Sequence, residues 1–315
     1  MASHSKDIKP SDRIFGSLVF VYRLFKSSFD YSIISYILLE NWYDAIMVRG
    51  GLRKEFVPKP RRKPIHNSPS GKLIGLYASN LGDCIISGDR IRLNYRGKEI
   101  LFYFKNYYQL VTTLTGIKEQ FIEGQYSQVK VKGYTVLDIG ASVCDSAIFF
   151  AVNGAKKVIT LEPYPFAYET GKRNIGLNGM GNKIKLMNCA CRAKSGVAII
   201  DPKFQNNDRD SIRYSKMGAR IPVTTLDALV RDWKINDGVL KIDCEGYEYE
   251  IVEGASISIL RKFRSIVMEY HYGFRSIEEK LKKSGFAVRH TNPFYMPKVD
   301  DKVDVLCGLI FAERI

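Results

Sequence analysis

The sequence predicts an α/β protein whose main domain is a mostly parallel sheet with helices on both faces. After Lys132, short apolar strands alternate with helical segments, which is the order that strand–helix–strand units produce. The stretch VLDIGASVCDSAIFFA at 136–151 also runs from a strand through a glycine loop into a helix, as nucleotide sites do. We therefore expect three regions, at 1–52, 53–130 and 131–315.

The first two regions carry their own local signals. Apolar residues recur at helical spacing over 11–27 and 31–49, which predicts two helices. The run at 53–64 is basic and contains prolines, so we expect an exposed connector there. Between 72 and 104, β-like runs alternate with turn residues and predict a small antiparallel sheet, and a helix around 106–124 leads into the main domain.

Seven strands are expected in the main domain. Five of them should lie parallel, and we place them at 134–140, 157–163, 183–190, 239–243 and 265–271. The last two should form an antiparallel pair at the sheet edge, and we place them at 285–291 and 305–312. The intervening helices are expected to end near 153 and to span 165–178, 225–232 and 247–253.

Charge and composition bound the classes of partner. The 315 residues are 45% hydrophobic, enough for a sizeable core, and the formal net charge is +15. Residues 1–130 hold 20 Lys and Arg against 11 Asp and Glu. A basic surface favours nucleic acid, acidic lipid headgroups or phosphate-bearing substrates, although an ordinary basic soluble surface explains it equally well.

We expect a cytoplasmic protein. Charged residues from Lys6 to Arg13 precede any apolar run, so a signal peptide is not expected. Charges interrupt the apolar stretch 14–39, which leaves it too short to span a membrane but allows peripheral membrane contact through an amphipathic helix. The six cysteines form no C-x-x-C pair, which favours reduced thiols over a zinc site, and we expect no metal.

Polar side chains end four of the predicted parallel strands. They are Asp138, Glu162 and Asp243, and Glu269 together with His271. In a doubly wound sheet, ligands bind at the carboxyl ends of the strands. We therefore expect a site where these side chains converge.

The glycine loop indicates which ligand this site takes. Gly140 and Ala141 permit close approach of a ligand, but Ser142 and Cys144 occupy the positions at which a dinucleotide loop has glycines. Asp145 would also repel a pyrophosphate. These residues argue against an NAD-dependent oxidoreductase and favour a cationic ligand without phosphate.

S-adenosylmethionine is such a ligand. We expect Asp138 to act on its ammonium, directly or through water, and Glu162 to accept hydrogen bonds from its ribose hydroxyls. Gly140, Ala141 and Ser142 complete the predicted cofactor site on one side of the sheet. Cys189, Ala190 and Asp243 complete it on the other.

Several segments resemble the FkbM-type class I methyltransferases in order and spacing over roughly 131–315. They are VLDIGA at 136–141, LEPYPF at 161–166, LKIDCEGYE at 240–248, VEGA at 252–255 and VMEYH at 267–271. In addition, NWYDA at 41–45 is similar to the leader of archaeal members. The resemblance implies a Rossmann-like fold and S-adenosylmethionine-dependent methylation, usually of a hydroxyl on a sugar or another secondary metabolite.

The loop departs from the family pattern. The family usually has G-A-N-x-G, whereas this chain has GASVC at 140–144. Ser142 can replace some of the hydrogen bonding of the asparagine, and we expect Cys144 to need no positive φ in the first helical turn. A cofactor-poor, non-catalytic homologue is therefore one alternative.

Methyl transfer to oxygen requires alignment of the acceptor and a base. We favour His271 as the base, because an imidazole titrates near neutral pH, with Glu269 orienting it or the acceptor. Asp243 is the second candidate, and Glu245 lies beside it.

The acceptor is left open between two classes. The first is a hydroxyl of a sugar, a glycan or another small metabolite, including anionic or lipid-linked ones. The second is RNA, which the net charge favours and the lack of a recognisable RNA-binding module disfavours. The NPFY at 292–295 resembles a motif of amino-group methyltransferases, but its position predicts a turn. The sequence predicts no oligomeric state.

Overall fold

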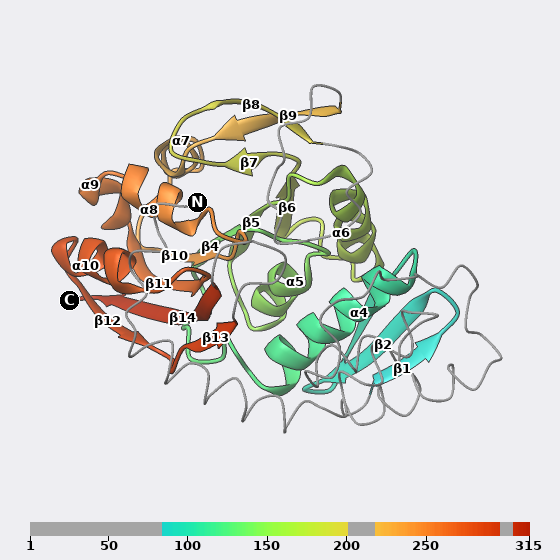
Figure 1. The fold of residues 1–315 in the computed structure, drawn as a ribbon. Helices are drawn as coiled ribbons and strands as arrows, with labels where there is room; N and C mark the ends of the chain where they lie inside the picture. Colours follow the sequence, from blue (N-terminus) through green and yellow to red (C-terminus); the bar gives the residue numbers. More distant parts are fainter. Residues whose placement is uncertain (1–83, 201–217, 297–304) are drawn as a thin grey trace, which may run out of the picture. The chain divides into compact units, whose positions relative to one another are not determined.

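The computed structural model describes residues 84–200, 218–296 and 305–315 (Figure 1). These residues belong to two compact units, one ending at Gln125 and the other beginning at Tyr126. The predicted N-terminal helices, the basic connector, the NWYDA segment and the first β-like run after Lys72 lie outside the described residues. The domain limits stay predictions.

The unit that ends at Gln125 contains the small antiparallel sheet. Its strands β1 (Cys84–Ser87), β2 (Arg90–Tyr95) and β3 (Lys98–Tyr103) pair in sequence order. Helix α4 (Tyr107–Gly116) follows and continues as a π-helical segment over Ile117–Ile122. Alternate residues of β2 face inward, which is the pattern of a sheet covered on one side.

The second unit is built on a mostly parallel sheet, as predicted, and its strand order is β12-β14-β11-β10-β4-β5-β6. Strands β11, β10, β4, β5 and β6 are parallel, β14 is antiparallel to its neighbours β11 and β12, and β13 pairs with β14. The strand bounds are β4 Thr135–Ile139, β5 Lys157–Leu161, β6 Ile184–Met187, β10 Gly238–Ile242, β11 Phe263–Tyr270, β12 Phe286–His290, β13 Phe294–Met296 and β14 Val305–Arg314.

Helices cover this sheet, and its central strands are therefore buried on both faces. All five residues of β10 are buried, including a lysine. The helix bounds are α5 Asp145–Val152, α6 Pro165–Leu177, α7 Leu226–Asp232, α8 Glu248–Gly254, α9 Ile257–Leu260 and α10 Arg275–Lys283. In the described part of the chain, no helix is both long enough and apolar enough to cross a membrane.

The third predicted parallel strand ends earlier than expected. β6 stops at Met187, and the Asn188 side chain donates to the carbonyl oxygens of Glu162 (2.8 Å) and Pro163 (3.1 Å). The chain then enters a second small sheet, in which β7 (Ala190–Cys191) pairs with β9 (Ala219–Thr224) and β9 with β8 (Gly196–Ile200). The sequence did not predict this sheet, which Figure 1 shows at the top of the view.

Helix α5 begins with a residue in an unusual conformation. Cys144 has φ +65°, so our expectation that it needs no positive φ is wrong. The chain turns sharply after β4, and the Cys144 amide donates to the Ala141 carbonyl oxygen at 2.7 Å. The left-handed conformation costs a non-glycine residue about 1–2 kcal/mol. Its thiol is buried beside Gly171 of α6, where an added Cβ would lie 2.5 Å from the sulfur.

Gly171→Ala should therefore lower the free energy of unfolding by about 1–3 kcal/mol, because the new methyl group overpacks against the Cys144 sulfur. Urea unfolding followed by circular dichroism measures the change. Gly176→Ala in the same helix is the control, since nothing lies within 4 Å of its added Cβ, and it should stabilise by up to about 1 kcal/mol.

In a Cys144→Gly background, Gly171→Ala should behave like this control, because the sulfur is gone. Equal destabilisation in both backgrounds would contradict the proposed contact.

Candidate functional site

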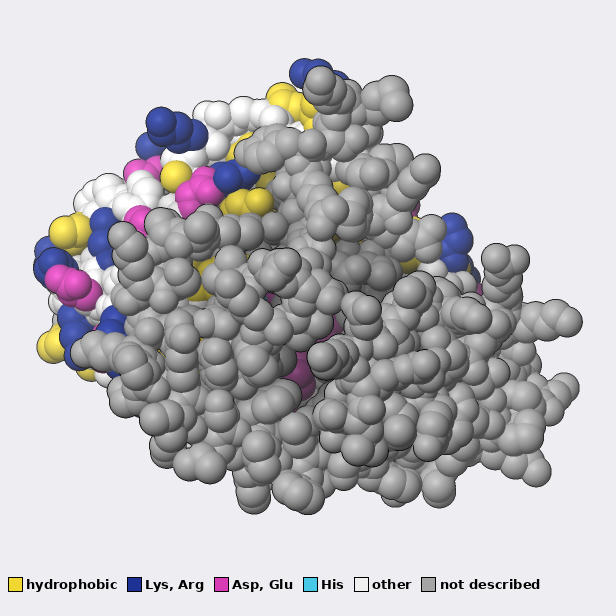
Figure 2. Space-filling view, viewed as in Figure 1, with side chains coloured by type: hydrophobic (Ala, Val, Ile, Leu, Met, Phe, Trp, Pro, Cys, Tyr) yellow, Lys and Arg dark blue, Asp and Glu magenta, His cyan; other side chains and the backbone are white. Residues whose placement is uncertain are grey.

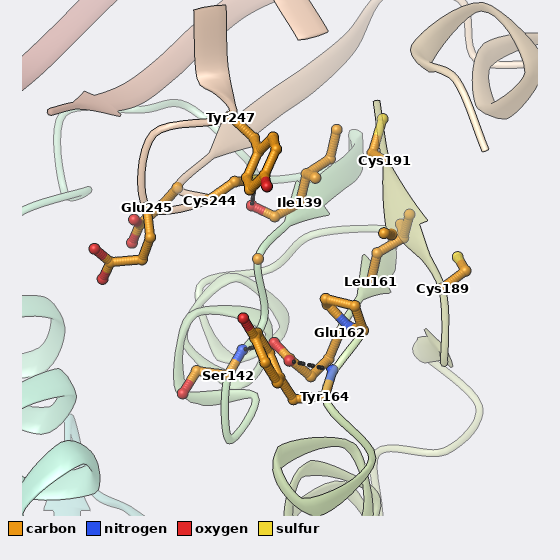
Figure 3. Close-up of a pocket in the computed structure, with 14 residues that line it drawn as sticks. Ile139, Ser142, Leu161, Glu162, Tyr164, Cys189, Cys191, Cys244, Glu245 and Tyr247 are labelled. Atoms are coloured by element: carbon orange, nitrogen blue, oxygen red, sulfur yellow. Dashed lines mark hydrogen bonds between the residues drawn. The ribbon is translucent and has the colours of Figure 1, made fainter. Parts of the chain in front are cut away.

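A cavity lies at the carboxyl ends of β4, β5 and β10, with β7 beside it (Figure 3). It encloses about 750 Å³ when the part open to solvent is counted, which suits a small ligand. The strands on either side of the β4–β10 pair continue in opposite directions across the sheet, so the cavity is at the topological switch point.

Seven predicted site residues line the cavity: Gly140, Ser142, Glu162, Cys189, Ala190, Asp243 and Glu245. Seven further lining residues were not predicted. They are Ile139, Leu161, Pro163, Tyr164, Cys191, Cys244 and Tyr247. Most of these directly flank predicted ones in the sequence, so the strand ends could have indicated them.

Gly140 is required by the close approach of two chain segments. Its φ is +89°, and a Cβ added there would overlap the Asp243 carbonyl oxygen. The amides of Gly140 and Ala141 both donate to the Leu161 carbonyl oxygen, at 3.1 and 2.9 Å. The loop after β4 is thus held against the ends of both neighbouring strands.

Glu162 presents a carboxylate whose orientation is fixed by two backbone groups (Figure 3). The Ser142 amide donates to its Oε2 at 2.7 Å, and the Tyr164 amide donates to its Oε1 at 2.9 Å. Burial raises the pKa of Glu162 to about 7, although these two hydrogen bonds work in the opposite direction. Because the loop contact comes from the Ser142 backbone, it does not require the asparagine of the family pattern.

Asp138 does not have the predicted position. Its side chain is 0% exposed, and its Oδ2 accepts hydrogen bonds from the hydroxyls of Ser146 (2.8 Å) and Thr160 (2.9 Å). Its Oδ1 lies 3.1 Å from the Lys241 ammonium. This burial argues against a direct contact with a ligand ammonium, while an action through water stays a prediction. Ala141 is also buried and is not among the residues that line the cavity.

The sequence analysis did not predict Lys241, which contacts two of the residues that line the cavity. Its ammonium donates to the Gly140 carbonyl oxygen at 2.6 Å and lies 3.9 Å from Asp243 Oδ2. Burial opposes its charge, but the carboxylates of Asp138 and Asp243 outweigh it and raise the pKa of Lys241. A lysine inside the otherwise apolar strand GVLKI was the available signal, since a buried ammonium needs a counter-charge.

His271 is buried between two carboxylates rather than facing the cavity. Its Nδ1 lies 3.2 Å from Glu248 Oε1 and its Nε2 lies 3.3 Å from Glu245 Oε2. Burial would lower the pKa of His271, but Glu248 and Glu245 outweigh it and raise this pKa well above its ordinary value. Because a carboxylate lies beside each ring nitrogen, the arrangement favours an imidazolium, which argues against the base role that we favoured for this residue.

Glu248 was not predicted, and it explains part of this arrangement. Its carboxylate accepts hydrogen bonds from the amides of Cys244 (2.8 Å) and Gly246 (2.9 Å) at the start of α8. This fixes the turn that carries Asp243 and Glu245, which has a φ of +52° at Glu245 and +105° at Gly246.

Asp243 and Glu269 are the remaining predicted acids. Asp243 lines the cavity, and burial raises its pKa to about 6. Burial, followed by the charge of Asp243, raises the pKa of Glu269 to about 8. Glu269 is partly buried and is not among the lining residues.

One group of side chains has the geometry of metal ligands. Single ligand atoms of Asp243, Glu248 and His271 all lie within 4.8 Å of one another. In the structure the imidazole already pairs with Glu248, and the Glu248 carboxylate already accepts backbone hydrogen bonds. We therefore assign these contacts to ion pairing.

Tyr247, an aromatic residue of the cavity wall, is in contact with Arg192. Arg192 lies over the Tyr247 ring at 4.6 Å, and its guanidinium donates to both oxygens of Glu250, at 3.0 and 2.8 Å. The predicted turn at Asn292–Pro293 leads into β13 and is not part of the lining.

The comparisons with known proteins agree with this geometry. Residues 138–288 match the family model Methyltransf_21, described as "Methyltransferase FkbM domain". A search of curated proteins finds no match.

Three similar solved structures are methyltransferases or carry a related ligand. Precorrin-6y C5,15-methyltransferase from Geobacter metallireducens GS-15 is 15% identical, with 68% of this chain and 94% of that chain covered and a TM-score of 0.37. Ribosomal protein L11 methylase from Lactobacillus delbrueckii subsp. bulgaricus is 17% identical, with 68% and 82% covered and a TM-score of 0.35. P. horikoshii TYW2 in complex with MeSAdo is 13% identical, with 80% and 86% covered and a TM-score of 0.38. Because these TM-scores are below 0.5, we infer nothing about function from these likenesses.

Gly140→Ala should lower the free energy of unfolding by more than about 3 kcal/mol, since both the positive φ and the overlap with the Asp243 carbonyl oxygen oppose it. Gly133→Ala is the matched control: its φ is +82°, but nothing lies within 4 Å of the added Cβ. Chemical unfolding of both variants isolates the contribution of the overlap. If the two variants lost the same stability, the contact of Gly140 with Asp243 would not be the constraint.

Proposed function

We propose that this protein is an S-adenosylmethionine-dependent methyltransferase, because residues 138–288 match a family model described as a methyltransferase FkbM domain. We further propose that the acceptor is a hydroxyl of a sugar, a glycan or another small metabolite. The carrying observation is the cavity at the switch point, which has the buried Glu162 carboxylate on one side and Asp243 on the other. When bound, S-adenosylmethionine supplies an activated methyl group on a sulfonium.

The cavity residues suit a nucleoside that carries positive charge and no phosphate. The Glu162 carboxylate keeps lone pairs beyond its two backbone hydrogen bonds, and these can accept from the ribose hydroxyls. Ile139, Leu161 and Tyr164 provide apolar and aromatic surface for the base. Asp243 and Glu245 place negative charge on the opposite wall, which favours a cation there.

Asp243 is the group that we assign as general base. It lines the cavity, and a pKa of about 6 lets it be ionised at neutral pH while still accepting a proton from an acceptor hydroxyl. His271 holds Glu245 and Glu248 in place as an imidazolium and acts as a positioning residue. Glu245 is the second group that can face the acceptor, because its side chain is 37% exposed.

The acidic wall also favours a small-molecule acceptor over RNA, because it would repel phosphates close to the reacting centre. Where Figure 2 shows described residues at the upper left, Lys and Arg side chains lie beside Asp and Glu side chains. A non-catalytic homologue is disfavoured because the loop keeps its backbone contact with Glu162. A cytoplasmic location is part of the same proposal, and peripheral membrane contact is its alternative.

Cofactor affinity should depend on the ionisation of Glu162. With a pKa of about 7, the carboxylate protonates as the pH falls, and the affinity for S-adenosylhomocysteine should drop about fourfold between pH 8 and 6.5. Isothermal titration calorimetry measures this change. Glu162→Gln should bind about tenfold more weakly at pH 8 and lose the dependence, and a wild-type affinity that stays constant over this range would contradict the assignment.

Asp243→Asn should reduce methyl transfer by about 10²–10⁴-fold while S-adenosylhomocysteine binding persists, because only the base is lost. Glycan, lipid and RNA fractions from cells lacking the gene are incubated with the purified chain and S-adenosylmethionine. Mass spectrometry then searches for a product that carries one added methyl group. Methylation of the RNA fraction alone would show that the acceptor is RNA and not a small-molecule hydroxyl. A fully active Asp243→Asn variant would show that Asp243 is not the base.

A further inference from the structure

We propose that Lys241 is a positioning residue of the methyl-transfer site, which fixes the Gly140 carbonyl oxygen and keeps the Asp243 carboxylate charged. This inference rests on the proposed function, since Asp243 is assigned there as the base. Lys241 is buried, and of the residues near its ammonium it acts through Gly140 and Asp243, which both line the cavity.

The position of Lys241 follows from the register of the sheet. β10 and β4 are parallel neighbours, and Lys241 is the direct cross-strand partner of Asp138. Its ammonium lies 3.1 Å from Asp138 Oδ1 and donates to the Gly140 carbonyl oxygen at 2.6 Å. One side chain therefore ties the middle of one strand to the loop that follows the other.

The same ammonium also lies near Asp243, which directly follows β10. The distance from Lys241 Nζ to Asp243 Oδ2 is 3.9 Å. That distance is too long for a hydrogen bond but short enough for strong attraction in a partly buried site. Asp138 lies against Lys241, Ser146 and Thr160, so it compensates the charge of the lysine, and it is not among the residues that line the cavity.

The other charged groups near Asp243 are mostly acidic. Those that affect it from the neighbouring elements are Lys241, Glu245, His271 and Glu248, and its own charge raises the pKa of Glu269. His271 is the second cation of this set, but it pairs with Glu245 and Glu248. Removing the Lys241 charge would leave the carboxylates opposed by that imidazolium alone, and Asp243 would bind a proton more readily.

The test compares two variants that differ only at Lys241. Removing the lysine alone would leave Asp138 buried without its cation. The chosen pair is therefore Asp138→Asn, which keeps Lys241 beside Asp243, and the double variant Asp138→Asn/Lys241→Met, which removes both charges of the buried pair. The pKa of Asp243 is measured by carbon NMR of protein labelled at the aspartate carboxyl carbons, with Asp243→Asn identifying its signal.

The pKa of Asp243 should be higher in the double variant than in Asp138→Asn by about one pH unit or more. An equal or lower pKa in the double variant would overturn the proposal. A residue with a purely structural role would lower stability without moving this pKa, and thermal unfolding of both variants records that stability.

A second measurement addresses the loop. The affinity for S-adenosylhomocysteine, measured by calorimetry at pH 8, should be at least about fivefold weaker in the double variant than in Asp138→Asn, because the Gly140 carbonyl oxygen loses its donor. Equal affinity would overturn the loop part of the proposal.

The two measurements separate this inference from the proposed function. A wild-type chain that does not bind S-adenosylhomocysteine would overturn the proposed function. The NMR titration needs neither cofactor nor acceptor, so it still decides whether Lys241 controls the charge of Asp243.

Discussion

The close approach of β4 and β10 at their carboxyl ends is the constraint on which the site depends. Gly140 passes so near the Asp243 carbonyl oxygen that no Cβ fits, and the Lys241 ammonium bridges the two strands at Asp138 and at the Gly140 carbonyl oxygen. Buried ion pairs contribute little net stability but are costly to break on one side. The strand ends are thereby held in one arrangement, and the cavity walls follow from it.

The carboxylates on the two sides of the cavity, Glu162 and Asp243, have different neighbours. Two backbone amides orient Glu162 and leave its carboxylate available to a ligand, and burial raises its pKa. Near Asp243 the carboxylates are opposed by Lys241 and by the protonated His271. This division suits a ligand with hydroxyls at one end and positive charge at the other, which is how the proposed cofactor is built.

The sequence predicted the fold well, because strand and helix order depends on local periodicity. The parallel strands, the antiparallel C-terminal strands and the convergence of Glu162 and Asp243 are all found in the structure, and residues 138–288 match a family model described as a methyltransferase FkbM domain. The second small sheet was missed, because β7 has only two residues and pairs with a distant strand. Cys144 was misjudged, because the φ of a loop residue depends on how the loop is closed.

By itself, the sequence determined which residues stand at the ends of the strands, because each strand places its last side chains at the same edge of a parallel sheet. Only the tertiary structure decided what each of them does. The sequence suggested that Asp138 and His271 face a ligand. In the structure Asp138 pairs with Lys241, and His271 lies between Glu245 and Glu248. These partners come from other strands and turns, and they pair because a buried charge without a counter-charge is costly. The charge and direction of a polar side chain therefore depend on neighbours that lie far away in the sequence.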